Sequence, residues 1–180
     1  IIHDICIDKN NNLWIGTEDA GLNKLNMKDH SYTSFNDIKG LSQNCIHGLA
    51  SIDNHLWIGT HANGIDLMDI RTEKIIKHYT ISLNPYANKN DIIVYLYKLQ
   101  NNDLLVATAL GVYQYNSQKD IFEKLSQFPN NCRIQTLFED HDGVIWAGTL
   151  SKGRYYYNPA TSQHGEFKLN TINTSRTINN

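Results

Sequence analysis

Hydrophobic and polar residues alternate along most of this chain in short runs that polar turns separate. Alternation of this kind is typical of β-strands with one covered face, and the runs lack the apolar spacing of about 3.6 residues expected of a helix. Four such runs follow one another in a fixed order, so the pattern predicts repeated units of four short strands. The second strands of these units fall at residues 13–17, 56–60, 104–108 and 145–149.

The second strand of each unit carries a shared motif. Leu-Trp-Ile-Gly-Thr at 13–17 returns at 56–60 and, as Ile-Trp-Ala-Gly-Thr, at 145–149. A more distant copy, Leu-Leu-Val-Ala-Thr, stands at 104–108. The tryptophan positions and their equivalent are 14, 57, 105 and 146, at spacings of 43, 48 and 41 residues. Four-stranded units at this period predict the blades of a β-propeller.

The fold class expected is therefore all-β, a partial β-propeller of about four four-stranded antiparallel blades. We expect one domain, 1–180, with approximate blades at 1–39, 40–84, 85–127 and 128–180. An open arc of blades exposes two blade faces and strand edges, which invite pairing. The partner expected is thus the remaining blades of a longer protein, from which this chain is a cut piece, or a second copy that completes a ring.

The motif residues are expected to hold the blades together rather than to contact a ligand. A tryptophan ring can cover the face between neighbouring blades, and Gly-Thr can close the turn at the strand end. The residues given this structural role are Trp14, Gly16, Thr17, Trp57, Gly59, Thr60, Trp146, Gly148 and Thr149.

Composition and charge exclude several classes of function. With 16 basic and 18 acidic side chains the net charge is -2, whereas proteins that bind nucleic acid electrostatically have a basic surplus. No run approaches the roughly 20 apolar residues of a membrane span, so we expect no membrane contact from this segment itself.

The sequence offers no catalytic or metal-binding constellation. Its carboxylates are scattered, so we expect no catalytic residues and no enzyme activity in this segment. The eight histidines lack the His-Glu-x-x-His spacing, and the three cysteines lack a Cys-x-x-Cys pair, although such spacings mark common metal sites. We therefore expect no cofactor and no metal.

A ligand site is the remaining functional option. Propellers usually bind at one end of the central axis, through the residues that enter the first strand of each blade and the loops between the second and third strands. His3 and His47 hold the same position in two units and are expected at the same end. The candidate ligand-binding residues, which share polar or aromatic chemistry suited to sugars, are His3, His47, Tyr95, Gln135, His61 and Asn63.

The whole unit is similar to a known repeat. Upstream apolar positions, an Asp/Asn turn, Leu-Trp-Ile-Gly-Thr and a following Gly with an alternating strand together resemble the two-component regulator propeller repeat. Residues 40–44, Gly-Leu-Ser-Gln-Asn, resemble the spacer between its blades. The resemblance covers essentially the whole chain, and the third copy departs from it at Leu105 and Ala107.

This resemblance implies a function. Repeats of this family form the periplasmic sensor ectodomains of membrane-bound hybrid histidine kinases, chiefly in gut Bacteroidetes, and many members detect oligosaccharides. By resemblance, the chain is expected to be a ligand-sensing propeller segment of a hybrid two-component sensor histidine kinase/response regulator that signals across the inner membrane. The alternative is a purely structural or protein-interaction propeller, with the ligand bound elsewhere.

Overall fold

The computed structural model describes residues 1–81 and 92–167, and these residues form four antiparallel sheets of four strands each. Within every sheet, strands that follow one another along the chain pair with one another. The first sheet holds β1 (Ile2–Ile7), β2 (Asn12–Thr17), β3 (Leu22–Asn26) and β4 (Tyr32–Phe35). The second holds β5 (Ile46–Ile52), β6 (His55–Thr60), β7 (Ile65–Asp69) and β8 (Lys74–Tyr79). The third holds β9 (Ile93–Lys98), β10 (Leu104–Thr108), β11 (Gly111–Asn116) and β12 (Ile121–Lys124). The fourth holds β13 (Ile134–Glu139), β14 (Ile145–Thr149), β15 (Arg154–Tyr157) and β16 (His164–Phe167).

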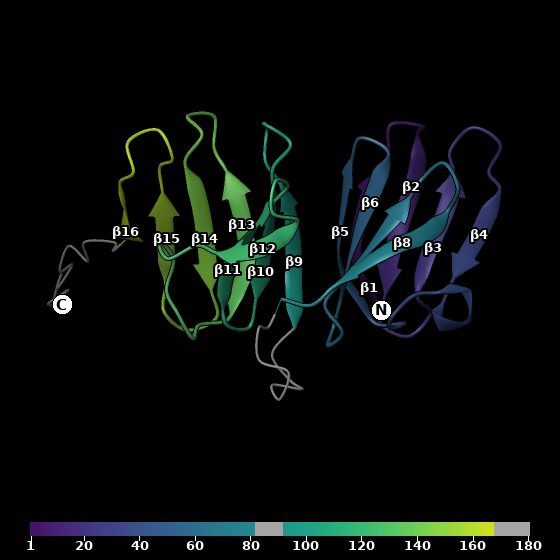
Figure 1. Ribbon diagram of the computed structural model, residues 1–180, viewed down its shortest axis with the longest axis horizontal. Helices are drawn as coiled ribbons and strands as arrows, with labels where there is room; N and C mark the ends of the chain where they lie inside the picture. The colour runs from purple at the N-terminus through teal and green to yellow at the C-terminus, as the bar shows by residue number, and fades with distance from the viewer. Residues whose placement is uncertain (82–91, 168–180) are drawn as a thin grey trace, which may run out of the picture.

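The sheets stand next to one another in the order of the sequence. The first two occupy the right half of the view in Figure 1 and the last two the left half. The first strand of each sheet is the inner one: β5 contacts both β1 and β9, and β9 contacts β13. A short 3-10 helix, η1 (Asp37–Lys39), connects the first sheet to the second. This arrangement confirms the predicted all-β propeller class.

The hydrophobic core consists of layers between neighbouring sheets. Trp14 and Phe35 of the first sheet share a buried cluster with Ile46 and Leu49 of the second. The rings of Trp57 in the second sheet and Tyr115 in the third lie 4.7 Å apart. Because each layer is built from two sheets, no sheet can bury its apolar residues alone, as is general for repeat proteins.

The third sheet forms although its motif is degenerate. Leu105, which replaces the tryptophan, is fully buried in the cluster between the third and fourth sheets, together with Ile134 and Leu137. Ala107, which replaces the glycine, lies in the same cluster. The position therefore requires a buried apolar residue, and a tryptophan is one way to supply it.

In the first and second sheets, the glycine before the motif threonine lies where the next sheet approaches closely. A Cβ on Gly16 would lie 2.8 Å from Cγ2 of Ile46, and a Cβ on Gly59 would lie 2.6 Å from Cγ2 of Ile93. Both isoleucines belong to the inner strand of the next sheet. The sequence interpretation gave these glycines to the turn, whereas the structure shows that the approach of the neighbouring sheet excludes a side chain there.

The threonines, in contrast, do close the turn after the second strand. In the first sheet the Thr17 hydroxyl donates to the carbonyl of Gly21 and accepts from the amide of Ala20. Gly21 has a φ of 69°, a conformation that favours glycine. The hydroxyl donations that share this geometry are Thr17 to Gly21 at 2.8 Å, Thr60 to Gly64 at 2.9 Å, Thr108 to Gly111 at 2.9 Å and Thr149 to Gly153 at 2.8 Å.

The blade limits 1–39, 40–84, 85–127 and 128–180 stay a prediction. Each sheet lies within one of these ranges, but the limit between 84 and 85 and the end of the last range lie outside the described residues. Over the described part of the chain, no helix has both the length and the apolar character needed to cross a membrane.

Candidate functional site

The inner strand of every sheet contains an irregularity at its second residue. The register with the partner strand shifts between Ile2 and Asp4 in the first sheet and between Ile46 and Gly48 in the second. Bulges of this kind leave one residue out of the ladder and re-aim its side chain, often next to functional sites. The residues at this position in the four sheets are His3, His47, Val94 and Gln135.

Three of the predicted histidines meet at one end of the first two sheets. The rings of His3 and His47 have centroids 4.2 Å apart, and those of His47 and His61 are 4.7 Å apart. The register explains the third member: Ile46 pairs with Thr60, so the residue after β6 stands beside the start of β5. The backbone amide of His61 accordingly donates to the carbonyl of Cys45 at 2.9 Å.

The surroundings of these rings favour neutral imidazole on His47. Burial lowers the pKa of His47, and the neighbouring His3 and His61 lower it further, while Glu18 acts in the opposite direction. Glu18 lies 2.5 Å from Nε2 of His3 through its Oε2. This hydrogen bond holds the pKa of the Glu18 carboxyl below its usual value, so Glu18 is an anion next to the histidines.

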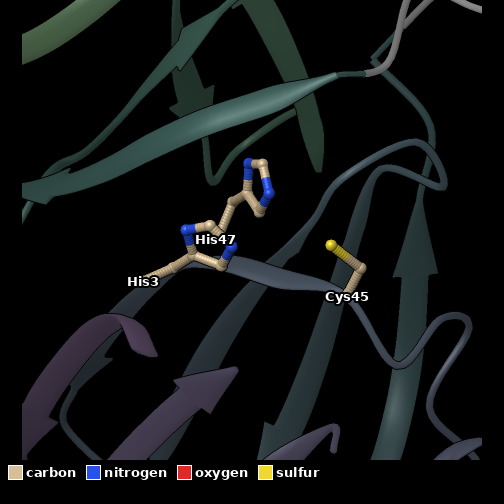
Figure 2. A group of neighbouring side chains, drawn as sticks. All are labelled: His3, Cys45 and His47. Carbon is tan, nitrogen blue, oxygen red and sulfur yellow. The ribbon is translucent and has the colours of Figure 1, made fainter. Parts of the chain in front are cut away.

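The imidazole of His61 and the thiol of Cys45 each offer an atom that could contact a ligand. Nδ1 of His61 is buried and has no hydrogen-bond partner among the described residues. Cys45 carries a free, half-buried thiol, and Figure 2 shows its sulfur directed to the side on which the His3 and His47 rings lie. One ligating atom from each of His3, Cys45 and His47 lies within 4.8 Å of the other two.

The sequence prediction missed Cys45. Spacing along the chain carries no signal for it, because its neighbours come from separate strands. The pairing register of β5 with β6 does place it. Because Ile46 pairs with Thr60, the residue before β5, Cys45, lies opposite the residue after β6, His61. Burial raises the pKa of the Cys45 thiol, and the charges of Glu18 and Asp19 raise it further.

The other predicted ligand residues make contacts of their own. Asn63 is exposed, and its amide nitrogen donates to the carbonyl of Ser42 at 2.8 Å, which fixes the loop beside His61. Tyr95 is half-buried on β9, where its ring centroid lies 6.3 Å from that of Tyr97. Gln135 is exposed on β13 and accepts from Nε of Arg133 at 3.2 Å.

A cavity that the sequence did not indicate opens between the second and third sheets. Its volume is about 410 Å³, within the range of small-molecule sites. Trp57 and Tyr115 supply aromatic surface, and the polar lining comes from the turns β5–β6, β9–β10 and β11–β12 with the adjoining strand ends. The polar lining residues are Asp53, His55, Asn101, Asn102, Asp103 and Ser117.

Comparison with known proteins finds a family that is similar to two stretches of the chain. The family model of the two-component regulator propeller matches residues 1–19 and 127–151. No curated protein matches the chain. A family of regulator propellers agrees with the expectation that this segment is not an enzyme.

Solved structures share the fold. The extracellular domain of the hybrid two-component system BT3049 from B. thetaiotaomicron is 24% identical over 91% of this chain and 23% of its own, with a TM-score of 0.72. That of BT4673 from the same organism is 21% identical over 98% of this chain and 24% of its own, with a TM-score of 0.77. The WD40 propeller of Doa1 is 15% identical over 93% of this chain and 51% of its own, with a TM-score of 0.64.

These likenesses differ in what they cover. The chain spans about a quarter of the length of the two extracellular domains, and identities this low establish the fold alone. The family match rests on the first and last of the four units, whose second strands hold Trp14 and Trp146. These two stretches are therefore similar to two-component regulator propeller repeats, as the sequence predicts, and the four sheets of the described residues have the propeller fold.

Proposed function

We propose that this chain is a ligand-sensing propeller segment in the periplasmic ectodomain of a hybrid two-component sensor histidine kinase/response regulator, and that its ligand is an oligosaccharide. The family match and the likeness to extracellular domains of hybrid two-component systems support the setting. The site chemistry supports the ligand class.

The observation that carries the proposal is the convergence of His3, His47 and His61 at one end of the propeller. A neutral imidazole both donates and accepts a hydrogen bond, which suits the hydroxyl groups of a sugar. The Asn63 amide lies in the same loop as His61. Tyr95 and Gln135 lie at or next to the bulge positions of the third and fourth inner strands, so they extend this end of the molecule as further ligand contacts.

Ligand binding transmits a signal only through a difference in affinity. An oligosaccharide that binds one arrangement of the ectodomain more tightly than another shifts the population towards the first arrangement. The His cluster is built from two sheets, and a ligand across it therefore responds to their relative placement. A structural propeller, which binds no ligand itself, is the rival function, and the exposed apolar faces of the end sheets described below favour it.

Calorimetry on the protein in the presence of EDTA tests the proposal. The titrants are a panel of di- to hexasaccharides of neutral hexoses, pentoses and uronic acids. We expect at least one to bind, and we expect His61→Ala and Asn63→Ala each to weaken its binding by about tenfold, since each removes hydrogen bonds worth about 1–2 kcal/mol.

His141→Ala is the matched control, because His141 lies on an exposed turn of the fourth sheet. Binding that is unchanged in both site variants but lost in Asn101→Ala would move the saccharide to the cavity between the second and third sheets. If no member of the panel binds, the structural role is the correct one.

A further inference from the structure

The histidine end of the propeller gathers more metal-ligating groups than saccharide binding requires. Two imidazoles and one thiol, from His3, His47 and Cys45, bring their ligating atoms within 4.8 Å of one another. A third imidazole, that of His61, contacts His47. We propose that His3, Cys45 and His47 bind a divalent transition-metal ion of the zinc class, with His61 as the fourth ligand.

The distances place His3, Cys45 and His47 within small side-chain rotations of a tetrahedral site, whereas His61 lies outside that group and needs a larger rotation to complete it. With Zn–N bonds of about 2.0–2.1 Å and a Zn–S bond of about 2.3 Å, ligating atoms lie roughly 3.3–3.8 Å apart and imidazole centroids about 5 Å apart. The centroid separations are 4.2 Å between His3 and His47 and 4.7 Å between His47 and His61. Both centroid separations lie within about 1 Å of that value. The ligating atoms of His3, Cys45 and His47, which lie within 4.8 Å of one another, need to approach by about 1 Å.

The hydrogen bonds around the rings select the nitrogens that would face the ion. Glu18 occupies Nε2 of His3, which leaves Nδ1 of that ring as the ligating atom. A carboxylate on the far nitrogen is the usual support of a metal-binding histidine. His47 is likewise held by a hydrogen bond to the backbone at Ile93. Nδ1 of His61 is buried without a partner among the described residues, and an ion would give it one.

The charges at the site also favour a cation. Glu18 and Asp19 act on the Cys45 sulfur as negative neighbours, and the Glu18 carboxylate is hydrogen-bonded to the His3 ring. Binding breaks the S–H bond of Cys45 and forms a metal–sulfur bond, and the proton leaves to the buffer. The metal itself drives this loss, because a coordinating thiol is deprotonated outright.

The ligand set indicates the metal class. Neutral imidazole with thiolate is the donor set of zinc sites, whereas calcium and magnesium take oxygen ligands. His3 comes from the first sheet and the other three ligands from the second, so a bound ion would connect two blades. The second group of close ligating atoms, in Asp140, His141 and Asp142, carries no such proposal, since Asp140 already accepts from Nε1 of Trp146 and the turn is exposed.

Titration of the reduced, EDTA-treated protein with Zn²⁺ alone tests the site. We expect one ion per chain. Cys45→Ser and His47→Ala should each weaken binding at least tenfold, and Glu18→Gln should weaken it roughly tenfold, as is usual for a residue that orients a ligand. Cys6→Ser and His141→Ala, which change the same residue types elsewhere, should leave the affinity unchanged.

Co²⁺ supplies a second readout that distinguishes ligation from loss of folding. Thiolate ligation gives a sulfur-to-cobalt charge-transfer band, which we expect in the protein and in Cys6→Ser but not in Cys45→Ser. Zn²⁺ should also raise the thermal midpoint of the protein and not that of Cys45→Ser. A Co²⁺ spectrum without the band, or Zn²⁺ binding that survives in Cys45→Ser, would overturn the proposal. No saccharide is present in these assays, so their outcome is independent of the proposed ligand.

Discussion

Asp8 fixes a tryptophan and a turn at once. Its carboxylate accepts from Nε1 of Trp14 at 2.8 Å and from the backbone and side chain of Asn12 at 2.9 Å. Asp140 repeats the arrangement in the fourth sheet, where it accepts from Nε1 of Trp146 at 2.7 Å. Asp8 is buried, whereas Asp140 is half-buried. If the carboxylate is removed, water can therefore hydrogen-bond to the donors around residue 140 but not to those around residue 8.

We therefore predict that Asp8→Ala lowers the free energy of unfolding by about 1–3 kcal/mol, since it leaves buried donors without a partner. Asp140→Ala, the matched control, should lower it less. Urea unfolding followed by tryptophan fluorescence measures both. Equal losses in the two variants would contradict the role given to burial.

The loss of stability in Asp8→Ala should also depend on pH. Burial works against the charge of Asp8, but hydrogen bonds from Asn12, Trp14 and Asn10 outweigh it and hold the pKa of Asp8 below its ordinary value. The stability from this carboxylate is thus present above the unfolded-state pKa of about 3.9 and is lost as the pH falls further. The difference between the protein and Asp8→Ala should shrink from pH 7 towards pH 3.

At the scale of single residues, sequence predicted the structural roles better than the site. Trp14 and Thr17 recur at fixed spacing, and their roles follow from the period. The pairing of His3 with His47 was also accessible, because equivalent blade positions face the same end. Cys45 was not accessible, since a thiol that meets two histidines through register leaves no spacing motif in the chain.

The contact between one sheet and the next depends on the motif glycines. At Gly59 an added Cβ would lie 2.6 Å from Cγ2 of Ile93, in the inner strand of the following sheet. At Gly148, the equivalent position of the fourth sheet, it would meet only Cγ2 of Thr136, at 3.0 Å. Thr136 belongs to the same sheet and is exposed, so it can rotate away.

We predict that Gly59→Ala lowers the free energy of unfolding by about 1–3 kcal/mol, the usual cost of overpacking, and Gly148→Ala by less than about 1 kcal/mol. Chemical denaturation of the two variants under one set of conditions decides this. Should Gly148→Ala be the more destabilised variant, the glycine would serve the strand end rather than the approach of the next sheet.

Elements were predictable because strand order, turn residues and motif all repeat with one period. The reason why the motif requires glycine at this position was harder to predict from the sequence. Sequence places Gly59 at the end of a strand, next to a turn, and only the packed neighbour shows that Ile93 takes the space of its side chain. Contacts between units are set by the arrangement of sheets, which a repeat pattern specifies only indirectly.

The first and fourth sheets each present exposed apolar side chains. Ile2 is 63% exposed, whereas Ile46, Ile93 and Ile134 at the equivalent place in the other sheets are fully buried. Phe138 of the fourth sheet is 57% exposed at the other end. Apolar faces of this kind mark interaction surfaces. We propose that further blades of the same protein, or a second copy, cover them.

We predict that the 180-residue protein self-associates in solution at micromolar concentration and that the double variant Ile2→Lys with Ile5→Lys is monomeric. Light scattering after size-exclusion chromatography gives the masses. Ile38→Lys is the control, because Ile38 is 90% exposed and lies on η1, outside the strands of both faces. A monomeric unmodified protein over the whole concentration range would refute a role of these faces in association.

The bulge in each inner strand frees one side chain from the pairing of the strands. One residue per blade leaves the ladder there, and in this chain the four residues are His3, His47, Val94 and Gln135. An exchange at such a position alters what the end of the propeller presents without breaking a strand pair. Under the proposed function, relatives with the same blades would diverge in the molecules they recognise through a handful of point changes, and a designer could rewrite this end one blade at a time.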